Sequence, residues 1–240
     1  MGYTESHKGK GRDYHESFVT ADVKPHRAML WRLEQRALDR LLQKHLGSTR
    51  SLTQLDFACG TGRILAHFQA KVASATGVDV STSMMEVARQ VAPRAELIEA
   101  DLTKQDVLAS RQFNLITAFR FFPNAEPELR QAVMNVLARH LAPGGVLVFN
   151  NHKNRNSLPR RVARLLGRES TDSTMTHREV EVLLSGAGLR VVEIVPLASL
   201  PFSDNHLVVP VSVLEFVEQR ISGVGALAGI AQDLIYVCAK

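Results

Sequence analysis

Three aspartates at nearly equal intervals are the residues of this sequence that could most readily act together. Asp56, Asp79 and Asp101 are separated by 23 and 22 residues, and each lies in or directly after a short apolar run. One strand–helix–strand unit has about this length, so the carboxylates are expected at one edge of three neighbouring parallel strands, with the outer two roughly 10 Å apart. Carboxylates accept hydrogen bonds from ribose hydroxyls and from an adenine amino group. The spacing therefore predicts a nucleoside-binding site.

A turn of small residues follows the first aspartate. Ala58, Gly60 and Gly62 lie between the apolar run that contains Asp56 and the start of a helical pattern. Small residues let a ligand come close to the backbone, and glycine adopts the positive φ that such a turn often needs. Doubly wound sheets bind their ligands at this end of the first strand. We expect the turn to form one wall of the same site.

The surrounding sequence alternates short apolar runs with helical patterns. The apolar runs predict strands at Leu52–Ala58, Ala75–Val80, Ala95–Glu99, Phe113–Phe119, Val146–Asn150, Arg190–Val195 and Asp233–Ala239. Apolar residues at helical spacing predict helices at Arg63–Lys71, Ser83–Val91, Pro127–His140 and Thr176–Gly186. Such alternation is typical of crossover units around a parallel sheet that is covered on both faces. We therefore predict an α/β fold with a doubly wound, mostly parallel sheet.

The N-terminal part and two insertions flank this pattern. Residues 1–25 read as a polar arm, and helical spacing of apolar residues predicts a helix over His26–Leu46, which Gly47 ends. We expect residues 1–47 to pack on a domain formed by residues 48–240. Insertions at residues 151–175 and 199–231, the second with a helix near Val213–Ile221, are expected to be lids or binding loops; alternatively they pack as extra helices or form a homodimer contact.

Five segments in order resemble the successive motifs of class I S-adenosylmethionine-dependent methyltransferases: Leu55–Gly62, Gly77–Ser81, Ala100–Leu102, Phe113–Phe119 and Leu141–Leu147. The resemblance covers about residues 50–150 and is weaker over the last two predicted strands. One departure is Ala58, where the family usually has the first glycine of its loop. The resemblance implies a Rossmann-like sheet of seven strands whose last strand, in a hairpin with the sixth, runs antiparallel.

The resemblance also implies S-adenosylmethionine as cofactor and a role for each matching residue. Residues of the first strand and its turn would face the methionine portion: Asp56, Ala58, Gly60 and Gly62. Residues after the second and third strands would hold the adenosine: Asp79 at the ribose hydroxyls, Val80 against the adenine ring, Asp101 at the adenine amino group, and the Leu102 backbone at the ring. Phe119 would border the sulfonium.

The implied activity is methyl transfer to a small-molecule acceptor, with the receiving oxygen, nitrogen or carbon left open. Two other functions remain alternatives. A nicotinamide-dependent oxidoreductase also has a glycine turn and an acid after the second strand, but its fingerprint requires a further glycine or alanine where this sequence has Leu65. A nonenzymatic nucleoside-binding or scaffold protein could keep the same fold.

Three further residues are candidates for roles beside the cofactor. His152 follows the fifth predicted strand at the ligand-binding edge, and an imidazole that titrates near neutrality could act as a general base; a plain loop histidine is the alternative. Arg120 could contact an anionic acceptor or pair with an acid. Tyr14 and the neighbouring arm could close over the cofactor.

The net charge of +5 comes from one basic segment, which has six cations and no acid and leaves a net charge of −1 for the rest of the chain: Lys153, Arg155, Arg160, Arg161, Arg164 and Arg168. Three interpretations are open. The segment could be a solvated helix face, could recognise a phosphorylated or carboxylated acceptor, or could contact an anionic membrane surface. Because the charge is localised, nucleic acid is not expected as a partner.

Composition excludes several classes of protein. The 240 residues are 45% apolar and 22% charged, values typical of a globular protein, which excludes wholesale disorder. The two cysteines, Cys59 and Cys238, are too few for a disulfide framework and indicate a reducing compartment, so we expect a cytoplasmic protein in which Cys59 is a packing residue. No signal peptide, membrane insertion or metal site is expected.

Overall fold

The fold is built on one sheet of seven strands. The computed structural model describes residues 11–20, 24–47, 51–168, 173–200 and 209–240. The strands are β1 Thr53–Phe57, β2 Ser74–Asp79, β3 Glu96–Glu99, β4 Phe113–Ala118, β5 Leu141–Asn151, β6 Arg190–Leu197 and β7 Asp233–Ala239. Their order across the sheet is β3-β2-β1-β4-β5-β7-β6, and within this sheet β7 runs in the direction opposite to the other strands. The predicted α/β fold and its antiparallel last strand are confirmed.

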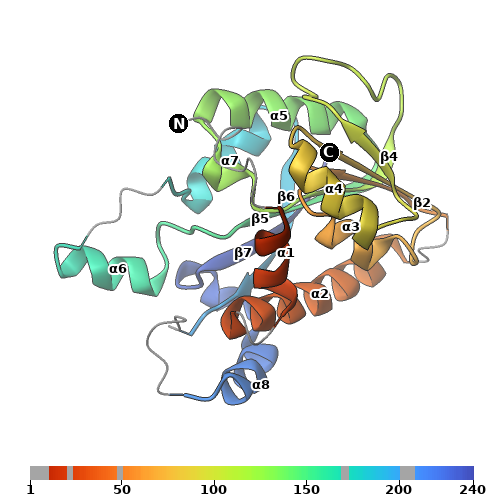
Figure 1. Cartoon of the computed structure of the whole chain (residues 1–240). Helices are drawn as coiled ribbons and strands as arrows, with labels where there is room; N and C mark the ends of the chain where they lie inside the picture. The colour runs from red at the N-terminus through yellow and green to blue at the C-terminus, as the bar shows by residue number, and fades with distance from the viewer. Residues whose placement is uncertain (1–10, 21–23, 48–50, 169–172, 201–208) are drawn as a thin grey trace.

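Helices cover both faces of the sheet (Figure 1). The helices α2 Pro25–Leu46, α3 Arg63–Phe68 and α4 Thr82–Val91 pack on one face, and α5 Pro127–His140 and α7 His177–Ser185 pack on the other. Successive side chains along a strand point to opposite faces of the sheet, so they join two separate hydrophobic cores. In β4, for example, Leu115 packs in the core under α2, α3 and α4, and Ile116 packs in the core under α5 and α7.

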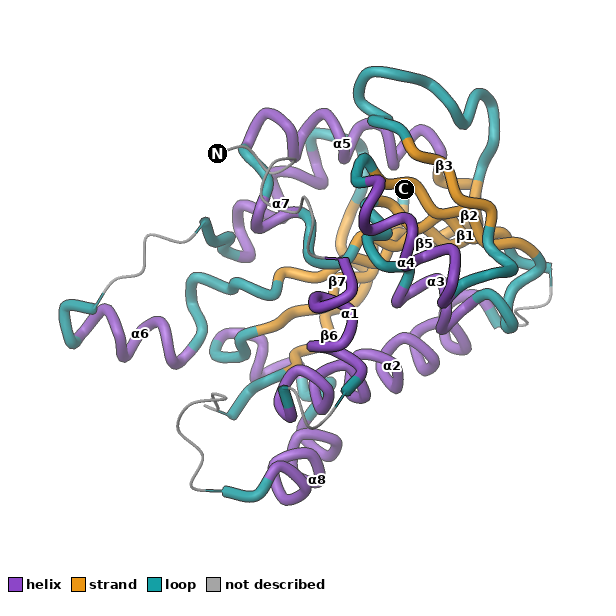
Figure 2. Tube along the Cα trace, in the orientation of Figure 1, coloured by secondary structure: helices purple, strands orange, loops and turns teal. Residues whose placement is uncertain are grey.

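A helix, α1 Gly11–Val19, lies within the segment for which the sequence predicted a polar arm. Its Ser17 and Phe18 side chains are buried, and it contacts α2 and α4. Figure 2 shows α1 beside α2 and α4, the two helices that it contacts. The description of an arm is therefore incomplete, because one buried aromatic residue at its C-terminal end fixes a helix on the domain. Residues 1–10 of the arm lie outside the described residues.

Both insertions contain helices. The first holds α6 Leu158–Leu165, which extends away from the body of the molecule (Figure 1). The second holds α8 Val211–Ile221, which packs on α2, and a short 3-10 helix, Gly225–Gly229. A salt bridge joins α8 to α2, since Arg32 Nη2 lies 2.6 Å from Glu215 Oε2. The interpretation as extra helices therefore applies in part to both insertions; residues 169–172 and 201–208 lie outside the described residues.

Candidate active site

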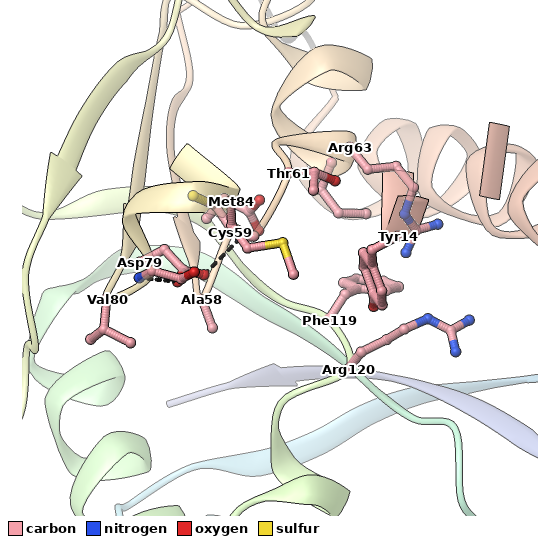
Figure 3. A pocket seen from close by; sticks show the side chains of 14 residues that line it. Tyr14, Ala58, Cys59, Thr61, Arg63, Asp79, Val80, Met84, Phe119 and Arg120 are labelled. Carbon is pink, nitrogen blue, oxygen red and sulfur yellow. Dashed lines mark hydrogen bonds between the residues drawn. The ribbon is translucent and has the colours of Figure 1, made fainter. Parts of the chain in front are cut away.

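The turn after β1 is held in place by the aspartate that ends β2. The backbone N–H of Gly60 donates to Asp79 Oδ2 at 2.7 Å, and that of Ser81 donates to Asp79 Oδ1 at 2.9 Å (Figure 3). Parallel pairing of β1 with β2 places Phe57, the last residue of β1, opposite Val78. Asp79 therefore lies one residue beyond the end of β1, next to the turn. The carboxylate therefore serves the turn as well as facing the cavity beside it.

The turn has a backbone that favours glycine at more than one place. Ala58 has a φ of 52° and Gly62 a φ of 75°, both in the left-handed region. A Cβ at Gly62 would lie 3.0 Å from the Ala88 Cβ, so glycine is also needed for α3 to approach α4. Ala58 tolerates this conformation at a cost of roughly 1–2 kcal/mol. This strain explains why glycine would be the more favourable residue at position 58.

The turn and the ends of β2 and β4 line a cavity of about 710 Å³, open solvent included. Among its lining residues are Tyr14, Asp56, Asp79, Phe119 and Arg120. In Figure 3, Asp79 and Val80 lie at one end of the cavity, while Tyr14, Phe119 and Arg120 gather at the other. The cavity thus has an acidic end and an aromatic end that also carries cations.

Asp56 is a buried acid on the wall of this cavity. Its side chain is 1% exposed, and Oδ1 accepts a 2.7 Å hydrogen bond from Thr117 Oγ1. Its other oxygen, Oδ2, has no hydrogen-bond partner among the described residues. Burial raises the pKa of Asp56 to about 7, and the hydrogen bond from Thr117 opposes this rise. An orphaned, buried carboxylate oxygen that lines a cavity is suited to a cationic or hydrogen-donating ligand group.

A second cavity of about 440 Å³ adjoins the first, because Ala58, Asp79 and Val80 line both. Asp101 and Leu102 line this second cavity from the chain that follows β3. Asp101 Oδ1 accepts hydrogen bonds from the Thr103 backbone and hydroxyl at 3.0 and 2.6 Å. Partial burial raises the pKa of Asp101, but these bonds and Lys104 outweigh burial and bring it below its usual value. The structure thus brings the expected cofactor residues to two joined cavities, except Gly62, which lines neither of them.

Helix α1 covers the aromatic end of the first cavity. The Phe18 ring lies between two guanidinium groups, with Arg63 Cζ 4.6 Å and Arg120 Cζ 4.7 Å from its centroid. Tyr14 lines the cavity and lies with its ring centroid 5.2 Å from that of Phe18. Cation–π contacts of this kind contribute about 0.5–2 kcal/mol each. Helix α1 is therefore attached to the site through the two arginines.

The two arginines are held by buried acids that sequence analysis missed. Glu34 of α2 is 0% exposed; its Oε2 lies 2.5 Å from Arg63 Nη1, and its Oε1 lies 3.1 Å from Arg120 Nη2. Asp233, the first residue of β7, lies 3.9 Å from Arg120 Nη2. Of the two roles considered for Arg120, the structure has the pairing with acids. A signal was present, because Glu34 falls between Leu30 and Leu38 on the apolar stripe of its helix, four residues from each.

Residues 55–145 match the family model described as a methyltransferase domain. The chain carries a methyltransferase domain. The matched residues include the turn, Asp56, Asp79 and Asp101, and they end in β5. The resemblance to class I methyltransferases that the sequence motifs indicated is thus confirmed.

Relatives of the methyltransferase domain include two N,N-dimethyltransferases named for dTDP-linked amino sugars. The chain is 32% identical over 150 residues to dTDP-4-amino-2,3,4,6-tetradeoxy-D-glucose N,N-dimethyltransferase of Saccharopolyspora spinosa, a match covering 61% of this chain and 51% of that one. It is 30% identical over 149 residues to dTDP-3-amino-3,6-dideoxy-alpha-D-glucopyranose N,N-dimethyltransferase of Streptomyces fradiae, covering 61% and 50%. The chain spans about half the length of these curated relatives.

The fold of the whole chain also has solved counterparts. Magnesium protoporphyrin IX methyltransferase from Synechocystis PCC 6803, crystallised with bound SAH, superposes with a TM-score of 0.67. The superposition covers 98% of this chain and 96% of that chain at 14% sequence identity. The methyltransferase fold therefore extends over the described chain beyond residues 55–145.

His152 lies apart from the two cavities. It lines a separate groove with arginines of the basic segment, and its Nδ1 is buried with no hydrogen-bond partner among the described residues. Burial and the nearby cations Arg120 and Lys153 lower the pKa of His152 well below its usual value.

Cys59 is buried with Sγ 3.7 Å from Met85 Sδ, and burial raises the pKa of its thiol, as expected for a packing residue. Within the described ranges, no helix is long and apolar enough to cross a bilayer.

Proposed function

We propose that this protein transfers a methyl group from S-adenosylmethionine to a small-molecule acceptor. The observation that carries the proposal is the pair of cavities joined at Asp79. One has the buried, partly unsatisfied Asp56 and the small-residue turn, and the other has Asp101 and Leu102. Together the two cavities offer hydrogen-bond acceptors and apolar walls in the order that the methionine portion, ribose and adenine of S-adenosylmethionine require. The family match favours this function over a nicotinamide-dependent oxidoreductase.

Each part of the cofactor has residues that would hold it. Asp79 would accept from the ribose hydroxyls, Asp101 from the adenine amino group, and Asp56 Oδ2 from the ammonium of the methionine portion. When bound, S-adenosylmethionine supplies an activated methyl group: the S–CH₃ bond breaks as the acceptor–CH₃ bond forms, its electron pair stays on sulfur, and the acceptor loses a proton. The chain's part is to align the acceptor and exclude water. Helix α1, through Tyr14 and Phe18, is placed to exclude water.

The affinity for S-adenosylmethionine is expected to decrease as the pH is lowered, because Asp56 becomes protonated. The carboxylate attracts the ligand's ammonium only when ionised, and burial raises its pKa to about 7. The dissociation constant should therefore rise about 5- to 10-fold between about pH 8 and pH 6. Calorimetric titration at several pH values measures this. Asp56→Asn should flatten the profile, whereas Asp233→Asn should preserve it, although burial raises the pKa of Asp233 also to about 7. A profile that Asp56→Asn leaves intact would contradict the assignment.

We propose an amino sugar as the acceptor. The proposal rests on the two relatives, whose names state that they dimethylate amino groups of dTDP-linked sugars. The test is a screen of amino sugars, free and nucleotide-linked, for release of S-adenosylhomocysteine, with calorimetry against S-adenosylmethionine and a nicotinamide dinucleotide beside it. Product release with a sugar acceptor supports the proposal. Binding of the nicotinamide compound in place of S-adenosylmethionine would refute it.

We also propose a cytoplasmic location, with which the two buried free cysteines agree.

His152 remains our candidate for a general base. Its lowered pKa keeps the imidazole neutral at pH 7, so its unprotonated ring nitrogen can accept a proton, although with weak driving force. His152→Ala is expected to reduce turnover about 10-fold while the affinity for S-adenosylmethionine stays normal. Single-turnover rates and cofactor titration measure the two effects. Unchanged turnover would remove His152 from the mechanism.

A further inference from the structure

A basic groove lies beside the cofactor cavities, and apart from His152 its lining residues have no part in the function described above. Its volume is about 1410 Å³, open solvent included, and its basic lining residues are His152, Arg155, Arg160, Arg164 and Arg168. No carboxylate is among the described residues that line it. Arg155 is partly neutralised from outside, since its Nη2 lies 3.3 Å from Glu179 Oε1. Arg160, Arg164 and Arg168 add further positive charge to the described lining, whereas His152, whose lowered pKa keeps it neutral, adds a buried ring nitrogen.

The orientation of α6 argues against a merely solvated basic helix. Arg160 and Arg164 of α6 are four residues apart and line the groove, as does Arg168 beyond the end of the helix, whereas the large apolar side chains of this segment do not. Leu165 is 87% exposed, Leu166 63% and Val162 45%. A surface helix normally buries its apolar stripe and exposes its charges. Here the charged stripe faces the groove at the expense of exposed leucines.

The groove adjoins the first cofactor cavity through two hydrogen-bonding side chains. Asn124 Nδ2 donates to the backbone oxygen of Arg120 at 2.7 Å and lies 3.5 Å from His152 Nε2. Arg120 lines the cofactor cavity and His152 lines the groove. Contacts through Asn124 therefore connect the wall of the groove with the wall of the cofactor cavity.

We propose that this groove binds a phosphate or diphosphate group carried by the acceptor. The proposal rests on the proposed methyl transfer and names the charged part of its substrate. Guanidinium groups match phosphate oxygens with paired hydrogen bonds, and residues four apart on a helix are about 6 Å apart along its axis. Arg160 and Arg164 can thus contact the two ends of one diphosphate. The Nδ1 of His152, as an N–H tautomer, can donate to the same group.

The test uses inorganic pyrophosphate, titrated calorimetrically into the full chain at about 50 mM salt. The double variant Arg160→Ala/Arg164→Ala is expected to weaken pyrophosphate binding at least about 10-fold, since two charge-assisted contacts are lost. Arg161→Ala is the matched control, because Arg161 lies on the same exposed helix but does not line the groove; it should change affinity less than about twofold. Arg160→Lys/Arg164→Lys should fall between, because lysine keeps the charge and loses the fork.

Further arms identify what carries the phosphate. Tighter binding of thymidine diphosphate than of pyrophosphate, with the same dependence on Arg160 and Arg164, points to a soluble nucleotide; equal binding means that the groove reads the phosphates alone. Pyrophosphate binding that the double variant leaves unchanged would overturn the proposal, as would no binding at about 10 mM. The proposal would also be overturned if the double variant lost binding to phosphatidylglycerol vesicles but kept its binding to pyrophosphate. That result would assign the helix to a membrane surface. S-Adenosylmethionine titrated into the same samples tests the proposed function separately.

Discussion

Asp79→Ala is expected to weaken the binding of S-adenosylmethionine by about 100-fold. The carboxylate would hold the ribose hydroxyls, and it accepts hydrogen bonds from the backbone of Gly60 and Ser81. Hydrogen bonds to a charged group contribute about 1.5–3 kcal/mol each, so loss of the ligand contacts together with loosening of the turn amounts to about 3 kcal/mol. Calorimetric titration of the folded variant measures the effect.

Two variants sharpen this prediction. Asp79→Asn keeps an oxygen that can accept from Gly60, so the turn should be retained and the affinity should lie between those of wild type and Asp79→Ala. Asp106→Ala removes an equally negative but exposed side chain outside the cavities and should bind normally. A dissociation constant that Asp79→Ala does not change would refute the nucleoside site and with it the proposed function.

Glu34→Ala is expected to lower the free energy of unfolding by about 3–5 kcal/mol. The substitution would leave Arg63 and Arg120 buried near each other without the carboxylate that joins them. Removing one partner of a buried ion pair costs this much because the remaining charge stays desolvated. Urea denaturation followed by circular dichroism measures the change. Glu215→Ala, which breaks an ion pair with the more exposed Arg32, is the control and should cost about 1 kcal/mol or less.

The pH dependence of stability gives an independent check on Glu34. Burial raises its pKa, but Arg63 and Arg120 prevail and hold the pKa below its ordinary value of 4.5. A carboxyl whose pKa is depressed by folding stabilises the protein above its unfolded pKa, and this contribution is lost as pH falls below about 4.5. Wild type should therefore lose more stability than Glu34→Gln between about pH 5 and pH 3. Parallel curves for the two proteins would contradict the role assigned to this ion network.

Periodicity predicted the regular part of the fold because each element follows a local rule. The helix Pro127–His140 begins and ends where the sequence placed it, and the last strand Asp233–Ala239 does so too. Strand β5 begins at Leu141, five residues before the predicted start at Val146, because residues 142–145 (Ala-Pro-Gly-Gly) read as a turn while the structure keeps them in the strand with Gly144 at a φ of 73°. The edge positions of Asp79 and Asp101 followed from equal spacing alone.

The residues that sequence analysis missed depend on contacts between distant segments. Phe18 packs against Arg63 and Arg120, and both arginines are ion-paired with Glu34 of α2. No local pattern encodes such a chain of contacts from α1 and α2 to the ends of the sheet. The sequence also did not predict which side of α6 faces the groove. A helical wheel separates the basic face from the apolar face but does not show which of them contacts the rest of the protein.

The reversed direction of β7 has a consequence for how this scaffold can change. Because β7 runs against its neighbours, its first residue, Asp233, comes to the edge where β5 and β6 end. Both long insertions leave the sheet at that edge, one after β5 and one between β6 and β7. Among the described residues, the connections at the opposite edge are short. On the proposed function, exchanging these two segments would change the acceptor preference and leave the residues proposed to hold adenosine unchanged.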